Sequence, residues 1–154
     1  LILTDSGIRV IEFNARFGDP EPQVVLPRLA TPLSSLLFAA ASGTLDEADA
    51  PRFALDTAVT VVLASEGYPE APQTGRVITG LDAASAVDGV HIAHAATTQR
   101  GDELVASGGR VLSVVAVGTT FAESVERAYR AIGEIGLDGS HYRSDIAARV
   151  IEGN

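Results

Sequence analysis

The sequence predicts an α+β fold in two parts, one over residues 1–45 and one over residues 46–154. The second part is expected to be a small, mostly antiparallel sheet domain with one long packed helix. Residues 57–64, TAVTVVLA, are almost all apolar or β-branched, which is typical of a buried strand. Residues 121–135 carry apolar side chains at helical spacing behind a T-x-x-E sequence. The acidic, proline-containing stretch 45–52 is typical of a linker, so we place the boundary there.

The chain opens with the pattern of a β-hairpin. Residues 1–4 are apolar and extended in character, and Asp5-Ser6-Gly7 has the composition of a turn. Residues 8–13 are rich in branched and aromatic side chains, so they predict the second strand.

Three polar residues on and after this second strand indicate a candidate site. Side chains alternate between the two faces of a strand, so an extended run to Arg16 places Glu12, Asn14 and Arg16 on one face. Carboxylate and amide oxygens are hard ligands that suit Mg²⁺, and a guanidinium offers a planar fork for a carboxylate or phosphate. The same alternation is typical of a solvated strand face, so these three residues alone leave both interpretations open.

The next residues have the composition of a helix start. Asp19 suits the N-cap, Pro20 suits the first helical position, and Glu21 complements the positive end of the helix dipole. A short helix is expected over 23–29, limited by Pro27 because proline lacks the backbone donor. Asp19 and Glu21 are candidates both for helix-start residues and for substrate ligands.

A second helix is predicted after Thr31 as N-cap and Pro32 as first helical residue, with Gly43 as its stop. Its apolar face comprises Leu33, Leu36, Leu37 and Ala40.

The second part alternates short apolar segments with glycine and proline. The predicted strands are 57–64, 76–79, 90–95, 103–106 and 110–117, with a helical turn or two over 81–87. Ser107-Gly108-Gly109 separates the last two strands, and paired glycines permit the positive φ values of a tight turn. We therefore predict that those two strands form a hairpin.

The long helix over 121–135 is the clearest local prediction. Thr120 and Glu123 form a capping box, and Gly136 is expected to end the helix. Its packed face comprises Ala122, Val125, Ala128, Tyr129 and Ile132. A last short helix is expected over 144–151, capped by Ser144 and Asp145.

Composition excludes several classes of protein. The 154 residues carry 20 acidic and 11 basic side chains, a net charge of −9, which argues against a general nucleic-acid or anionic-membrane binder. There is no cysteine, so disulfides, thiol nucleophiles and thiolate metal sites are excluded. No apolar stretch approaches the roughly 18 residues of a membrane span and no signal pattern is present, so the cytoplasm is the expected location.

Other polar residues give weaker indications. His91 and His94 are three apart on a predicted strand and point to opposite faces, so they are poor joint metal ligands. His141 stands alone in a loop. Arg110 and Arg143 are candidates for a phosphate contact, although surface ion pairs are the simpler interpretation.

Residues 10–23, VIEFNARFGDPEPQ, closely resemble the signature of the phosphoribosylamine–glycine ligase family of the ATP-grasp superfamily. Later blocks, including GYPEAPQTGRVITG and VASGGRVLSVVAVG, resemble the C-terminal domain of the same ligases. Two departures are Ala96 and Ala147, where the family pattern has glycine; each restricts the backbone and puts the shape of its loop in doubt.

The resemblance implies that residues 1–45 are the C-terminal piece of an ATP-grasp domain. It implies an ATP-dependent ligase that joins glycine to 5-phosphoribosylamine, giving glycinamide ribonucleotide, ADP and phosphate in purine biosynthesis. By the same resemblance, Glu12 and Asn14 bind Mg²⁺ or Mn²⁺, and Arg16 is a catalytic and substrate-binding residue. Asp19 and Glu21 would also bind substrate.

The chain begins at Leu1, and it lacks both methionine and the lysines that ATP enzymes place on phosphates. We therefore expect the nucleotide-binding portion of the same enzyme to lie upstream, and the chain alone to be inactive. Two alternatives stay open. One is another ATP-grasp ligase that shares Glu-x-Asn-x-Arg, such as a biotin carboxylase relative or another purine-pathway ligase. The other is a noncatalytic structural or interaction domain. The FGDPE sequence at 17–21 favours the glycine ligase.

Overall fold

A three-stranded antiparallel sheet forms the centre of the computed structural model, which describes residues 1–13 and 16–153. Its order is β3 (Thr57–Ala64), β7 (Arg110–Gly118) and β4 (Val90–His94). The long apolar strand β7 takes the middle position because both of its edges and both of its faces are then covered.

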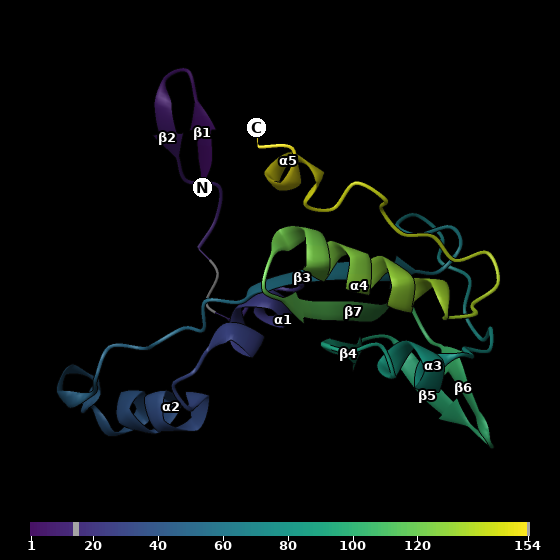
Figure 1. The fold of residues 1–154 in the computed structure, drawn as a ribbon, viewed down its shortest axis with the longest axis horizontal. Coiled ribbons are helices and arrows are strands. Elements are labelled where there is room, and N and C mark those ends of the chain that lie inside the picture. Colours follow the sequence, from purple (N-terminus) through teal and green to yellow (C-terminus); the bar gives the residue numbers. More distant parts are fainter. Residues whose placement is uncertain (14–15, 154) are drawn as a thin grey trace.

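Helix α4 (Phe121–Gly133) lies across one face of this sheet, as Figure 1 shows. The pairing register sets Val61 opposite Val114 and Val114 opposite Ile92, so one row of branched side chains crosses all three strands toward the helix. On the helix, Ala128, Ala131 and Ile132 are buried against that row. This layer of helix on sheet confirms the predicted α+β class and the predicted long packed helix.

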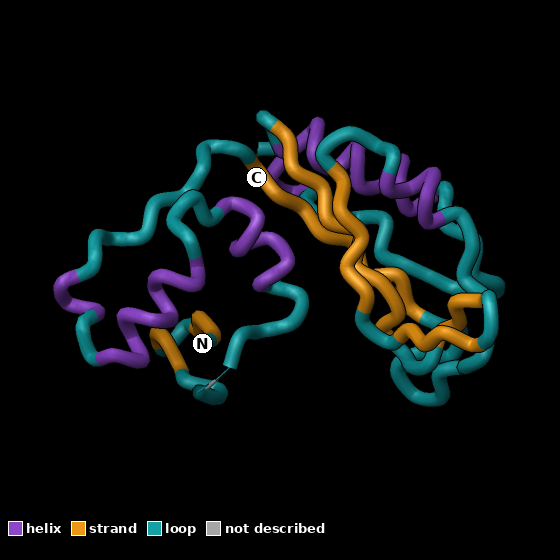
Figure 2. The backbone as a smooth tube through the Cα atoms, turned by 90° about the horizontal axis from the view of Figure 1, so that it is seen from below, coloured by secondary structure: helices purple, strands orange, loops and turns teal. Residues whose placement is uncertain are grey.

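The opposite face of the sheet is covered by α1 (Pro22–Val25) and the 3₁₀ turn η1 (Leu26–Arg28). Figure 2 shows the sheet between α4 on one side and α1 on the other. Val115, on this second face, is only 2% exposed. The helix tightens at Pro27, as predicted, because proline has no N–H to continue the α-helical ladder. The end of the run 10–23 and the residues that follow it are thereby held on the C-terminal sheet.

The opening hairpin is present as β1 (Ile2–Thr4) and β2 (Gly7–Arg9), with Gly7 at φ 98°. The prediction that the second strand extends over residues 8–13 is wrong, since pairing ends at Arg9. Arg9 lies opposite Ile2, so the residues after it have no strand of the described chain beside them. The hairpin lies away from the central sheet in both overall views (Figures 1 and 2).

Helix α2 (Leu33–Ser42) ends as predicted at Gly43, whose φ of 72° suits a residue without a β-carbon. Thr31 is not its N-cap, because its hydroxyl accepts a hydrogen bond from the Arg52 backbone N–H at 2.8 Å, and Pro32 holds that position instead. No residue of α2 is buried, and no helix among residues 1–13 and 16–153 has the length and apolar character that crossing a bilayer requires.

The predicted pairing of strands 103–106 and 110–117 is wrong. β6 (Glu103–Ala106) pairs with β5 (Thr97–Arg100) in a separate two-stranded sheet. The turn of this hairpin contains Gly101 at φ 62°, whereas neither glycine of Ser107-Gly108-Gly109 has a positive φ. β5, with the sequence TTQR, is too polar to stand out as a strand, so its partner was misassigned.

The shorter segments also differ from prediction. Residues 76–79 make isolated bridges rather than a strand, linking Val77 to Val105 and Thr79 to Gly136. The helix predicted over 81–87 is the shorter α3 (Leu81–Ser85). The short 3₁₀ turn η2 (Leu45–Glu47) lies within the stretch predicted as a linker.

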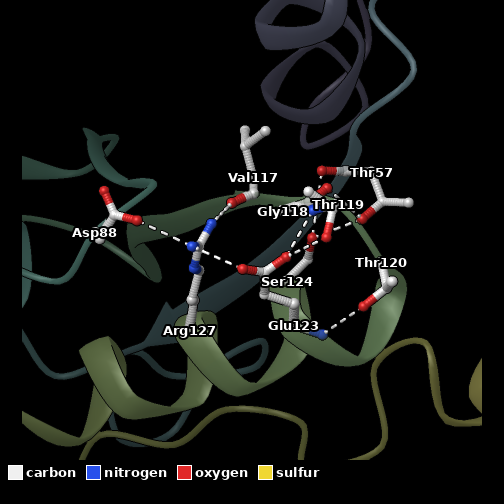
Figure 3. A network of polar contacts seen from close by, with 9 residues as sticks. All are labelled: Thr57, Asp88, Val117, Gly118, Thr119, Thr120, Glu123, Ser124 and Arg127. Carbon is white, nitrogen blue, oxygen red and sulfur yellow. Dashed lines mark hydrogen bonds and ion pairs between the residues drawn. The ribbon is translucent and has the colours of Figure 1, made fainter.

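The start of α4 has the predicted cap in a modified form, drawn in Figure 3. The Thr120 hydroxyl accepts a hydrogen bond from the Glu123 N–H at 3.2 Å. The Glu123 carboxylate reaches back one residue further than a standard capping box and accepts from the Thr119 hydroxyl and N–H, both at 2.7 Å. These hydrogen bonds from Thr119 lower the pKa of Glu123, with a smaller contribution from the charge of Arg127.

Arg127 connects α4 to the sheet in the same view (Figure 3). Its guanidinium pairs with Glu123 at 2.8 Å and Asp88 at 2.9 Å, and donates to the Val117 carbonyl at 2.6 Å. Arg127 therefore joins β7, α4 and the turn before β4 through one side chain.

The end of α4 and the start of the last helix both differ from prediction. α4 ends at Gly133 rather than near Gly136, because Gly136 is bridged to Thr79 and cannot continue the helix. α5 (Ala148–Ile151) begins later than residue 144. Asp145 does not cap it, since its carboxylate is hydrogen-bonded to the Arg143 guanidinium, which lowers the pKa of Asp145.

Ala147 has a φ of 61°, the left-handed conformation for which the family pattern has glycine. That conformation costs an L-residue about 1–2 kcal/mol, which glycine avoids because it has no β-carbon. Glycine also makes the unfolded chain more flexible, and this offsets part of the stabilisation. We expect Ala147→Gly to raise the free energy of unfolding by about 0.5–1 kcal/mol in chemical denaturation. Ala148→Gly, one residue later in α5, should lower it by about 0.5–1 kcal/mol, and equal signs would contradict the assignment.

Candidate functional site

The residues predicted to bind metal and substrate lie in the connection between β2 and α1. Glu12 and Arg16 are both exposed there, and the Arg16 guanidinium donates to the carbonyl of Phe17 at 2.7 Å. Asn14, the third member of the predicted face, lies outside the described residues. The strand that was expected to align these side chains ends at Arg9, so their common face stays a prediction.

The fit to a magnesium ion rests on donor chemistry. Among residues 1–13 and 16–153, no group of three or more His, Cys, Asp or Glu side chains is arranged to hold a metal ion. Protein sites for Mg²⁺ commonly use one or two carboxylates and leave the other positions to water and substrate phosphates. A Glu12 carboxylate with an Asn14 amide satisfies that requirement, so the predicted donor pair suits Mg²⁺ or Mn²⁺.

Asp19 is not the N-cap that its sequence position predicts. Glu21 holds the cap and Pro22 the first helical position, each two residues after the Asp19 and Pro20 that the composition predicts for those positions. The Asp19 carboxylate instead forms an ion pair with Arg110 at 2.8 Å, while its second oxygen accepts from the Gln23 amide at 3.0 Å. Asp19 therefore turns toward β7 rather than toward the amides of the helix start.

Glu21 lies at the helix start as predicted, without a side-chain cap hydrogen bond. Its backbone carbonyl accepts from the N–H groups of Val24 and Val25, each at 3.1 Å. Its carboxylate folds over Gly18, where any β-carbon would collide with it. Gly18 thus leaves room for the carboxylate of Glu21 beside the chain that leads from Arg16.

A small cavity of about 220 Å³ adjoins this segment, lined by Pro20, Thr60, Val62, Arg143 and Ile146. Arg143 itself is paired with Asp145 at 2.7 Å, which raises the pKa of Arg143 and uses its charge locally. The ion-pair interpretation of Arg143 is therefore the one that the structure supports.

The histidines behave as their spacing predicts. His91 and His94 are three residues apart on β4, and this odd spacing puts their side chains on opposite faces of the strand. His91 borders a cavity with Pro22 and Leu26, whereas the His94 ring contacts the Thr97 hydroxyl at 3.0 Å. His141 makes backbone hydrogen bonds to Ala64.

The sequence did not predict that Arg110 contacts Asp19 and so belongs to the candidate site. Arg110 is separated from Asp19 by 91 residues, and no local pattern links the two. Its position at the start of β7 was visible in the sequence, and an ion pair was one of two interpretations, but its partner was not.

Comparison with known proteins identifies the family of this chain. The family "Phosphoribosylglycinamide synthetase, C domain" matches residues 58–149. A phosphoribosylamine–glycine ligase from Leifsonia xyli is 67% identical over 153 residues, covering 97% of this chain and 36% of that protein. One from Streptomyces coelicolor is 56% identical, with 97% and 36% covered.

A solved structure is also similar. The crystal structure of phosphoribosylamine–glycine ligase from Thermotoga maritima matches with a TM-score of 0.77 and 32% identity, over 94% of this chain and 34% of that one. The chain thus spans about a third of the length of the relatives that it matches. The resemblance inferred from residues 10–23 and from the later blocks is confirmed, and the chain belongs to the phosphoribosylglycinamide synthetase family, whose C domain it contains.

Proposed function

We propose that this chain is the C-terminal part of an ATP-dependent ligase that joins glycine to 5-phosphoribosylamine. The observation that carries the proposal is the 67% identity to a phosphoribosylamine–glycine ligase over 97% of the chain, a match long enough to include most of the signature run 10–23. The FGDPE sequence within that run favours this ligase over other ATP-grasp enzymes.

The reaction takes place in two transfers. A glycine carboxylate oxygen attacks the γ-phosphorus of ATP, forming a phosphorus–oxygen bond as the bond to ADP breaks. The amine of phosphoribosylamine then attacks the acyl carbon, forming the carbon–nitrogen bond as inorganic phosphate leaves and the amine loses a proton. A bound Mg²⁺ or Mn²⁺ would neutralise and align the phosphates during the first transfer.

The residues of this chain have distinct parts in that chemistry. Glu12 and Asn14 would hold the metal ion through hard oxygen atoms. Arg16 binds the glycine carboxylate or the acyl phosphate through its planar fork and stabilises negative charge as it develops. Glu21 is a substrate ligand beside Gly18, and residues 46–154 support this side of the cleft.

A substrate screen on the enzyme that contains this chain tests the proposal. Glycinamide ribonucleotide and phosphate are expected only when ATP, glycine and 5-phosphoribosylamine are all present. Turnover with bicarbonate in place of glycine would favour a biotin carboxylase-like ligase, and no turnover with either would favour a noncatalytic domain. Residues 1–154 alone are expected to show no ligation, because the chain has no lysine for the nucleotide phosphates.

A further inference from the structure

Arg110 holds Asp19 through two separate atoms. One guanidinium nitrogen donates to the Asp19 carboxylate at 2.8 Å, and the other donates to the Asp19 backbone carbonyl at 3.0 Å. A planar guanidinium that binds a side chain and the main chain of the same residue specifies the path of the backbone as well as the charge.

Both ends of this contact are anchored. Arg110 begins β7, where it pairs with Ala64 and its carbonyl accepts from the Ala96 N–H at 3.1 Å. The second carboxylate oxygen of Asp19 accepts from Gln23, which belongs to α1 and thus to the layer that covers the sheet. The contact therefore ties both the side chain and the backbone of Asp19 to the central sheet.

The carboxylate of Asp19 accepts one hydrogen bond on each oxygen, from Arg110 on the sheet and from Gln23 in α1, so its orientation is set by two separate elements. Its neighbours Arg16 and Glu21 have no comparable anchor to the sheet among the contacts of the described residues. We infer that Arg110 is a positioning residue, which acts through Asp19 to orient Arg16 and Glu21. This inference rests on the proposed function, because it treats Arg16 and Glu21 as substrate contacts.

A simple surface ion pair is the competing explanation. The side chains of Arg110 and Asp19 are 38% and 41% exposed, and exposed pairs typically contribute only about 0–1 kcal/mol to stability. That explanation predicts no change in kinetics when Arg110 is replaced. Positioning predicts a kinetic loss, because a displacement of about 1 Å in a reactive geometry can cost about 100-fold.

The test is steady-state kinetics of the complete enzyme with Arg110→Ala, Arg110→Lys, Asp19→Ala and the Asp19→Ala/Arg110→Ala double variant. We expect Arg110→Ala to lower kcat/KM for glycine and phosphoribosylamine about 10- to 100-fold while the KM for ATP is unchanged. Arg110→Lys should recover part of the loss, since an ammonium keeps one of the two contacts. The double variant should lose no more than either single variant, because the two residues act as a unit.

Arg100→Ala is the matched control, since Arg100 forms a similar exposed pair with Glu103 at 3.3 Å in the β5–β6 hairpin. Its kinetics should be unchanged. Unchanged kinetics for Arg110→Ala would overturn the inference. A much larger loss for Asp19→Ala than for Arg110→Ala, multiplying in the double variant, would also overturn it, because Asp19 would then contact substrate directly.

Hydrogen exchange separates this inference from the proposed function. The N–H groups of Val24 and Val25, bonded to the Glu21 carbonyl, should exchange faster in Arg110→Ala and Arg110→Lys than in Arg100→Ala. If the wild-type enzyme does not ligate glycine but these N–H groups still exchange faster in Arg110→Ala, only the proposed function is refuted. Normal exchange and normal kinetics in an active enzyme would refute the inference alone, and Arg110→Lys provides the measurement if Arg110→Ala does not fold.

Discussion

Glu12→Ala in the enzyme that contains this chain is expected to lower kcat about 100-fold or more and to weaken the dependence of the rate on Mg²⁺. Charge stabilisation by a bound metal ion contributes several kcal/mol to phosphoryl transfer, and each 1.36 kcal/mol corresponds to about tenfold in rate. Removing a carboxylate ligand should remove a large part of that stabilisation. The measurement is the initial rate of phosphate release across a titration of MgCl₂.

Two companion variants make this prediction specific. Glu12→Gln keeps the shape and one oxygen ligand but removes the charge, so its apparent affinity for Mg²⁺ should fall between those of the wild type and Glu12→Ala. Glu126→Ala removes an exposed carboxylate from α4 and should leave the rate unchanged. A Glu12→Ala enzyme with the wild-type rate and wild-type Mg²⁺ dependence would remove Glu12 from the metal site.

Leu112→Ala is expected to lower the free energy of unfolding of the chain by about 2–5 kcal/mol. Leu112 is 0% exposed and belongs to the hydrophobic core, on the same face of β7 as Val114 and opposite Leu63 of β3. Truncation loses the transfer free energy of its side chain and leaves a cavity that a three-stranded sheet cannot close. Urea denaturation followed by circular dichroism measures the change.

Leu55→Ala provides the matched control, because it removes the same atoms from a side chain that is 99% exposed. Its effect should stay within about 0.5 kcal/mol of zero. Similar losses for the two variants would mean that Leu55 is buried in solution, or that β7 is not the centre of the core.

Short sequence patterns correctly predicted the elements whose formation depends only on residues close together in the chain. The run at 57–64 became β3 over the predicted residues, since a continuous series of branched side chains suits a strand with both faces covered. Thr120 caps α4 because a hydroxyl three residues before an N–H can reach it regardless of the rest of the fold. Gly43 ends α2 for a similarly local reason, its φ of 72°.

Two predictions that depended on the choice of a strand partner failed. Residues 103–106 and 110–117 are neighbours in sequence with glycines between them, yet β7 pairs with β3 and β4 because its apolar side chains need cover on both faces. The strand after Gly7 stops at Arg9 because hydrogen bonding ends where the opposite strand ends. Neither outcome has a signature within the segment itself.

The candidate site shows the same difference between what nearby residues specify and what distant contacts specify. The sequence by itself determined the family and the kinds and order of the donor atoms in residues 10–23, because both are carried by the residues alone. The tertiary structure alone decided that Asp19 turns away from the helix start and bonds to Arg110 across 91 residues. A helix cap needs only one turn of chain, whereas this ion pair requires the packing of α1 on the sheet, which brings β7 beside the signature.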